Sequence, residues 1–147
     1  MSLLLEAAKS FAKYAHAGEV DKAGVDYYAG HLTTVASMVE TEEEKVVAFL
    51  HDVVEDTDAT LFDLFSYFVP SFGYEIAHVI ADAVDAMTKR AEENYDNYLS
   101  RVKENPIATV VKLADLEHNS DLGRLSVVSD KDLARVEKYN AAKSYLA

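Results

Sequence analysis

The sequence contains no cysteine, and this absence limits both its cross-links and its metal chemistry. No disulfide can form, and any bound metal must take its ligands from His, Asp or Glu rather than from thiolates. The sequence also has no apolar run near the ~20 residues that span a bilayer. We therefore expect a cytoplasmic protein that does not insert into a membrane.

Basic residues are scarce as well. The chain has 14 Lys and Arg against 26 Asp and Glu, which gives a formal net charge of -12. Because proteins bind nucleic acids largely by neutralising phosphates with basic side chains, we expect no nucleic-acid partner. A small phosphorylated ligand is still compatible with this charge, since a divalent cation and a few well-placed lysines can make the local field positive.

Proline and glycine are also rare, at two and five residues, which leaves few of the turns that separate strands. Apolar residues recur instead with the 3.6-residue period of helices. We expect an all-α fold, an irregular multi-helix bundle formed by a single domain over residues 1–147. The predicted helices cover residues 3–16, 31–39, 42–56, 60–68, 73–87, 92–104, 106–119 and 130–146.

The segment HDVVED, residues 51–56, places one histidine and three acids directly after the apolar run VVAFL. On a continuous helix His51 lies over Glu55, and Asp52 lies over Asp56. Carboxylates beside a core are costly unless they are paired or bind a metal. A metal site is therefore favoured over the alternative, a solvated helix face.

Further metal ligands must come from other segments. Asp115 lies inside the apolar VVKLADL, and His31 lies at the start of a predicted helix. His31, His51, Asp52 and Asp115 would form a set of two imidazoles and two carboxylates. Such a set suits Mn²⁺ or Fe²⁺, with Zn²⁺, Co²⁺ or Mg²⁺ as further candidates. The alternatives are a capping or core histidine at 31 and a structural acid at 115.

The order His, His-Asp, Asp, with HDVVED and KLADLEHN around it, resembles the HD-domain metal-dependent phosphohydrolases. Within them, the chain is similar to the hydrolase domain of the RelA/SpoT alarmone enzymes and to the small alarmone hydrolases. The resemblance covers nearly the whole chain, through AHAGEVDKAGVDYYAGHLTTVA, AFLHDVVEDTDAT, NPIATVVKLADLEHNSDL and ARVEKY. HDxxED joined to a distant His and to KLAD is far more specific than a His-Asp doublet alone.

The resemblance implies a role for each matching residue. It makes the four residues above the metal ligands, with Mn²⁺ as the expected ion. Glu55 and Asp56 match the acidic pair that acts on the attacking water. The implied contacts with the phosphates, ribose and base of the substrate are Lys22, Lys112, Asn119, Arg135 and Tyr139.

Two positions depart from the family pattern. Asp21 stands where the family has an arginine that stacks on guanine, and an aspartate cannot replace that cation–π contact. Asp121 stands where the family commonly has a second arginine, and Arg124 follows only later. We therefore expect intact metal chemistry with weak discrimination between guanine and adenine.

The activity implied by the resemblance is 3′-pyrophosphate hydrolysis of guanosine 3′,5′-bis(diphosphate), or (p)ppGpp, the nucleotide of the stringent response. One alternative is an HD-type phosphomonoesterase that acts on a nucleotide. The other is a non-catalytic nucleotide-binding module, which Glu55 and Asp56 disfavour because a sensor needs no acids that activate water. A small-molecule nucleotide is the expected partner, and the pattern carries no prediction of the oligomeric state.

Overall fold

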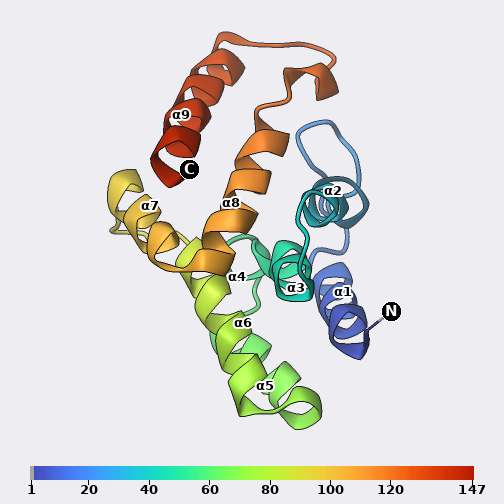
Figure 1. Ribbon diagram of the computed structural model, residues 1–147. Coiled ribbons are helices and arrows are strands. Elements are labelled where there is room, and N and C mark those ends of the chain that lie inside the picture. Colours follow the sequence, from blue (N-terminus) through green and yellow to red (C-terminus); the bar gives the residue numbers. More distant parts are fainter. Residues whose placement is uncertain (1) are drawn as a thin grey trace.

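The computed structural model describes residues 2–147, and every regular element in this range is a helix (Figure 1). The predicted all-α class is therefore confirmed. None of these helices is long and apolar enough to cross a bilayer. The elements are α1 (Leu3–Ala15), η1 (Tyr28–Leu32), α2 (Thr33–Ser37), α3 (Glu42–Leu50), α4 (Val53–Asp56), α5 (Leu61–Phe72), α6 (Tyr74–Met87), α7 (Tyr95–Glu104), α8 (Pro106–Asn119), η2 (Leu122–Arg124) and α9 (Asp130–Leu146).

Helix α3 forms the centre of the bundle. Its last five residues, Val46 to Leu50, are all buried, as expected for a helix that is surrounded by other helices. It packs against α1, α2, α6 and α8, while α9 packs on α8 (Figure 1). Helices α5 and α6 pack against each other as a hairpin. The C-terminal end of α3 therefore meets α2 and α8 in the interior, where the predicted metal ligands lie.

Side-chain caps fix the predicted helix starts. Thr41 and Glu44 form the predicted capping box of α3, and Thr60 and Ser129 cap α5 and α9. Pro106 occupies the first turn of α8, where its missing N–H costs nothing. Four predictions agree with the structure within one residue at each end, namely those for residues 3–16, 73–87, 106–119 and 130–146.

The helix predicted over residues 60–68 is too short in the prediction. In the structure it extends to Phe72 and includes Pro70. The carbonyl group that loses its partner at the proline belongs to Ser66, which is exposed, so water can replace the lost hydrogen bond. The helix ends at Gly73 instead, whose φ of 90° is a conformation that favours glycine.

The helix predicted over residues 31–39 begins earlier, at Tyr28. Its first turn, η1, is π-helical: the N–H of Leu32 donates to the carbonyl oxygen of Tyr27, five residues back, at 3.1 Å. Regular α-helix follows only to Ser37. The prediction missed the π turn because apolar spacing does not distinguish it from an α-helical turn.

The helix predicted as continuous over residues 42–56 is interrupted. Helix α3 ends at Leu50, and α4 begins at Val53. Between them Asp52 has φ -102° and ψ 0°, outside the helical region. Neighbouring residues on a regular helix point about 100° apart. The bend lets the side chains of His51 and Asp52 turn toward the same point, and this makes the interruption functionally important.

Hydrogen bonds from the Arg101 side chain hold the loop between α6 and α7 in place. The helix predicted over residues 92–104 begins at Tyr95, because the Asn94 side chain accepts the N–H of Asn97 and caps it there. The Arg101 guanidinium donates to the Glu93 carboxylate at 2.6 and 2.8 Å. The same guanidinium also donates to the carbonyl oxygens of Asp85 and Thr88.

Replacing Phe68 by Ala should lower the free energy of unfolding by about 3–5 kcal/mol, because its fully buried ring would leave a cavity in the core. Urea unfolding followed by circular dichroism measures this loss. Phe62→Ala on the same helix is the matched control. Phe62 is 76% exposed, so its replacement should change the free energy by less than about 0.5 kcal/mol. Equal losses in both variants would contradict the packing of α5.

Candidate metal centre

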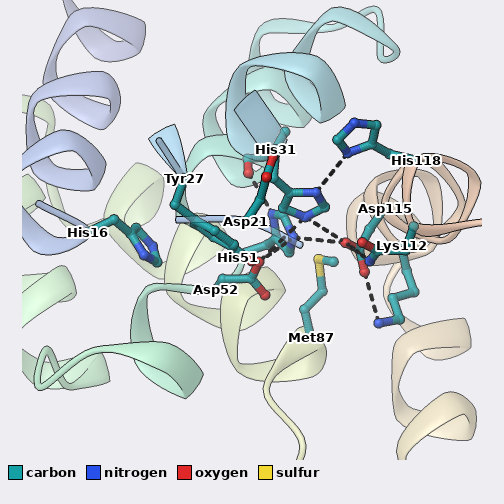
Figure 2. A network of polar contacts seen from close by, with 12 residues as sticks. His16, Asp21, Tyr27, His31, His51, Asp52, Met87, Lys112, Asp115 and His118 are labelled. Atoms are coloured by element: carbon teal, nitrogen blue, oxygen red, sulfur yellow. Dashed lines mark hydrogen bonds and ion pairs between the residues drawn. The ribbon is translucent and has the colours of Figure 1, made fainter. Parts of the chain in front are cut away.

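The four predicted metal ligands converge on one point (Figure 2). The Nε2 atoms of both histidines face oxygens of both aspartates. The distance is 2.9 Å from His31 to Asp115 Oδ1, 3.0 Å from His51 to Asp52 Oδ2, and 3.4 and 3.6 Å for the other two pairs. Ligand atoms about 2.1 Å from an ion and at right angles to each other lie about 3 Å apart, so this spacing fits a single divalent ion.

Three separate segments supply these side chains. His31 comes from the π turn η1, His51 and Asp52 come from the bend between α3 and α4, and Asp115 comes from the C-terminal half of α8. His31, His51 and Asp115 are buried, and Asp52 is partly buried. The site therefore exists only when η1, the end of α3 and α8 are packed together.

The hydrogen bonding of His51 tests whether a cation fits. Its Nδ1 lies 2.6 Å from the carbonyl oxygen of Ala48, which can only accept, so Nδ1 carries the hydrogen. In the neutral imidazole Nε2 then presents a lone pair, and this buried atom has no hydrogen-bond partner among residues 2–147. A lone pair held against two carboxylates is unfavourable unless a proton or a metal cation lies between them. The donor set therefore fits a divalent metal.

Charges around the centre keep both carboxylates ionised. Burial opposes the ionised form of Asp115, but the Lys112 ammonium at 3.0 Å and the two histidines hold its pKa well below the usual range. Burial likewise opposes the ionised form of Asp52, but His51 lowers its pKa to about 2. For His51 burial is again outweighed, since the carboxylates raise its pKa. A metal ion would replace that proton as the partner of the carboxylates.

Two residues outside the predicted ligand set support the ligands. The Tyr27 hydroxyl donates to Asp52 Oδ2 at 2.5 Å. Burial and the Asp52 charge raise the pKa of Tyr27 far above that of free tyrosine, so it remains a donor. The Nδ1 of His118 lies 2.9 Å from that of His31, and the two rings stack. Such outer contacts orient metal ligands. Tyr27 lies one turn before His31, and this spacing was the signal in the sequence that could have identified it.

The ligands open onto a cavity of about 480 Å³. Five of the chain's 14 basic residues line it, namely Lys22, Lys89, Lys112, Arg124 and Lys138. Five acids also line it, namely Asp21, Asp52, Glu55, Asp56 and Asp115, so a bound divalent cation would make the balance of charge positive and would suit an anionic ligand. A larger cavity of about 680 Å³ between α1 and α5 has no histidine among the described residues that line it, so we do not assign the site there.

The predicted substrate residues divide into two groups. Lys22, Lys112, Asn119 and Tyr139 line the cavity. Lys112 and Asn119 also donate to Asp115 at 3.0 Å, and Lys22 donates to the Tyr139 hydroxyl at 3.3 Å. Arg135 is not among the described residues that line the cavity, and it pairs with Asp132 on α9 at 3.2 Å. Lys138, on the same helix, lines the cavity instead and lies over the Tyr95 ring.

Glu55 and Asp56 also line the cavity. They lie in α4, which follows the bend that carries His51 and Asp52. Glu55 Oε1 accepts the backbone N–H of Lys89 at 2.9 Å. Asp56 is exposed as a residue, but protein atoms remove part of the hydration of its carboxyl group. This desolvation, together with the charges of Asp52 and Glu55, raises the pKa of Asp56 to about 7. A carboxyl group with that pKa can both take and return a proton near neutral pH.

Metal-free protein should bind about one Mn²⁺ per chain, and His51→Ala or Asp115→Ala should abolish this binding, because each removes a ligand from a four-residue set. Isothermal titration measures the stoichiometry. A chelator should lower the Tm of the loaded wild type by linkage. His78→Ala, at an exposed position, is the control and should bind as the wild type does. Full binding by both ligand variants would exclude this assignment.

Asp56→Asn should raise the Tm of the metal-free protein more at pH 8 than at pH 5. The folded-state pKa of about 7 lies above the ordinary value of 3.8, so ionisation of Asp56 opposes folding. This cost grows as the pH rises from about 4 to 7 and is constant above that range. Thermal melts in the presence of a chelator measure the difference. The same gain at both pH values would contradict the raised pKa.

No protein-family model matches the chain. The guanosine-3′,5′-bis(diphosphate) 3′-pyrophosphohydrolase of Spiroplasma citri is 30% identical over 152 residues, which cover 93% of this chain and 20% of that protein. The probable guanosine-3′,5′-bis(diphosphate) 3′-pyrophosphohydrolase of Synechocystis sp. is 31% identical over 140 residues, which cover 87% and 18%. The chain thus spans about a fifth of the length of these curated relatives.

A solved structure has the same fold. It is described as a metazoan ortholog of SpoT that hydrolyzes ppGpp and plays a role in starvation responses. The two chains match with a TM-score of 0.73 over 99% of this chain and 86% of the other, at 21% sequence identity. At this identity the structural match shows the fold alone. The sequence matches to the two pyrophosphohydrolases are a separate observation. Together they confirm the predicted resemblance of the chain to the hydrolase domain of the HD-type RelA/SpoT proteins.

Proposed function

We propose that the chain is a metal-dependent phosphohydrolase that acts on a nucleotide, with (p)ppGpp 3′-pyrophosphate hydrolysis as its leading activity. One observation carries the proposal: two histidines and two aspartates converge beside a cavity that also holds three further acids and five basic side chains. The names of the relatives support the nucleotide and the bond that is cleaved. The proposed location is the cytoplasm, and a small nucleotide rather than a nucleic acid is the proposed partner.

His31, His51, Asp52 and Asp115 would hold the metal, and Mn²⁺ is the proposed ion because mixed imidazole and carboxylate ligands suit it. A divalent ion bound there would lower the pKa of a coordinated water and would polarise a phosphoryl oxygen. The outer contacts of Tyr27 and His118 would keep Asp52 and His31 oriented toward it.

Glu55 and Asp56 would act in the proton-transfer steps of the reaction. Asp56, whose carboxyl group has a pKa of about 7 in the metal-free structure and lines the cavity, would take a proton from the attacking water and return one to the leaving ribose oxygen. Glu55 is held by the Lys89 backbone N–H, which leaves its second oxygen available to orient that water. General acid–base catalysis of this kind typically contributes 10²–10⁴-fold.

The basic residues would bind the phosphates. Lys22, Lys89 and Lys138 line the cavity without an ion pair to a carboxylate among the described residues, so their charges are available to a ligand. Lys112 is committed to Asp115, and it would contribute a positive charge beside the metal rather than a separate phosphate contact. These charges would neutralise the phosphoryl oxygens as the transition state forms.

Release of phosphate and pyrophosphate from a nucleotide panel, with and without Mn²⁺, tests the proposal. The panel contains guanosine 3′,5′-bis(diphosphate), its adenine counterpart and nucleoside monophosphates. We expect metal-dependent pyrophosphate release from the first compound. Phosphate release from monophosphates alone would favour a phosphomonoesterase instead. Nucleotide binding without any hydrolysis would favour a non-catalytic module.

The double variant Glu55→Gln with Asp56→Asn should retain Mn²⁺ and lose about 10²–10⁴-fold in kcat, because both acids lie outside the ligand set but within the cavity. Steady-state kinetics and metal titration measure the two effects separately. Asp58→Asn, two residues beyond Asp56 and outside this cavity, is the matched control and should keep the wild-type kcat. Wild-type turnover in the double variant would show that the acids are only solvated surface.

A further inference from the structure

The side chain of Asp21 is a buried anchor rather than a free charge in the cavity. It is 5% exposed, and its Oδ1 accepts the backbone N–H groups of Ala23 and Val25 at 2.8 and 3.1 Å. These bonds close the turn that precedes η1. Its Oδ2 points at the Arg124 guanidinium, with the Nη2 atom 3.6 Å away. One carboxylate therefore holds the N-terminal loop and the segment after α8 together.

The close approach of Asp21 to the helix that carries His31 depends on Gly30. A Cβ atom at position 30 would lie 2.6 Å from Asp21 Oδ2, closer than van der Waals contact allows. Gly30 directly precedes His31 in η1. The carboxylate is thus fitted against the backbone of the element that supplies a metal ligand.

Arg124 continues the connection to the end of α8. Its Nη1 donates to the carbonyl oxygen of His118 at 2.8 Å, while its Nη2 faces Asp21. The Arg124 side chain is only 14% exposed, so solvent screens this pair weakly. A planar guanidinium can serve both acceptors at fixed angles, which an ammonium cannot do in the same way.

His118 completes the connection to the metal centre. Figure 2 shows its ring reaching from α8 to His31, with the two Nδ1 atoms 2.9 Å apart. The Nε2 of His31 faces Asp52 and Asp115, so coordination through Nε2 requires the hydrogen on Nδ1. His118 Nδ1 must then accept that hydrogen. The orientation of the His118 ring therefore controls which nitrogen of His31 is free to bind a metal.

We infer that the Asp21–Arg124 pair is a positioning device that holds His118, and through it His31, in the orientation that the proposed metal centre requires. The inference concerns the site of the proposed function and rests on its metal dependence. It assigns a role to two paired residues that lie outside the four-residue ligand set. The sequence identified both only as departures from the family pattern, because their contact joins segments that are far apart in the chain.

The Mn²⁺ affinity of metal-free protein, measured by electron paramagnetic resonance of the free ion, tests this inference without any turnover. Asp21→Asn keeps an oxygen for the turn and removes the charge that faces Arg124, and Arg124→Gln removes the other charge. Each should weaken Mn²⁺ binding about tenfold, as loss of an outer contact to a metal ligand does. The double variant should be no weaker than either single one, because the two act as a unit.

Two further comparisons separate positioning from general stability. In a His118→Phe background, Asp21→Asn should cause no additional loss of Mn²⁺ affinity, because the connection is already cut. The matched control is the ion pair between Lys143 and Glu117 (2.9 Å), which also ties α8 to another segment but has no side-chain hydrogen bond to His118 among the described residues. Lys143→Ala and Glu117→Ala should leave Mn²⁺ affinity unchanged even where the Tm falls.

Wild-type Mn²⁺ affinity in folded Asp21→Asn and Arg124→Gln would overturn the inference, and so would additive losses in the double variant. If Arg124→Gln does not fold, Arg124→Lys retains the charge and should still weaken binding, because one ammonium does not reproduce the two contacts. A wild type that binds Mn²⁺ but hydrolyses no nucleotide would refute the proposed function and leave this inference supported by the affinities alone. A wild type that binds no Mn²⁺ would refute both.

Discussion

The electrostatic cost of two ionised carboxylates in the interior governs the structure around the cavity. Asp52 and Asp115 face the same two imidazoles, and both remain ionised despite burial. Their neighbours are arranged to offset this cost: the Tyr27 hydroxyl donates to Asp52, and Lys112 donates to Asp115. A cation between the carboxylates would complete the compensation. Several polar residues near the site therefore already donate hydrogen bonds to these carboxylates and are not free to bind a ligand.

The sequence predicted the fold class and most helices because the signals were local. Capping residues such as Thr41 and Ser129 act within one turn, and the 3.6-residue period repeats along each helix. It failed where tertiary packing or hydration decided the outcome. Pro70 remains inside α5 because the carbonyl group that it leaves unpaired belongs to an exposed residue. No proline or glycine lies at the bend at Asp52, so no residue type in the sequence indicates the bend.

The site was predictable to the extent that its residues lie at helical spacing or within one motif. Lys112 and Asn119 lie one turn on either side of Asp115, so their contacts with it follow from the helix alone. Lys138 was missed in favour of Arg135, since α9 buries little beyond Ala142 and Leu146 and gives no pattern that shows which face meets the cavity. Partners from distant segments, such as Arg124, required the folded chain.

The hydrogen bond that holds Glu55 comes from the main chain of residue 89 and not from a side chain. Any amino acid except proline can supply that N–H, so evolution can vary the side chain at this position without releasing the acid. The Arg101 contacts fix the same loop, and they protect the position of the amide from such changes. A substitution of Lys89 can therefore change the charge of the cavity, and with it the ligands that the cavity prefers, while Glu55 remains in place.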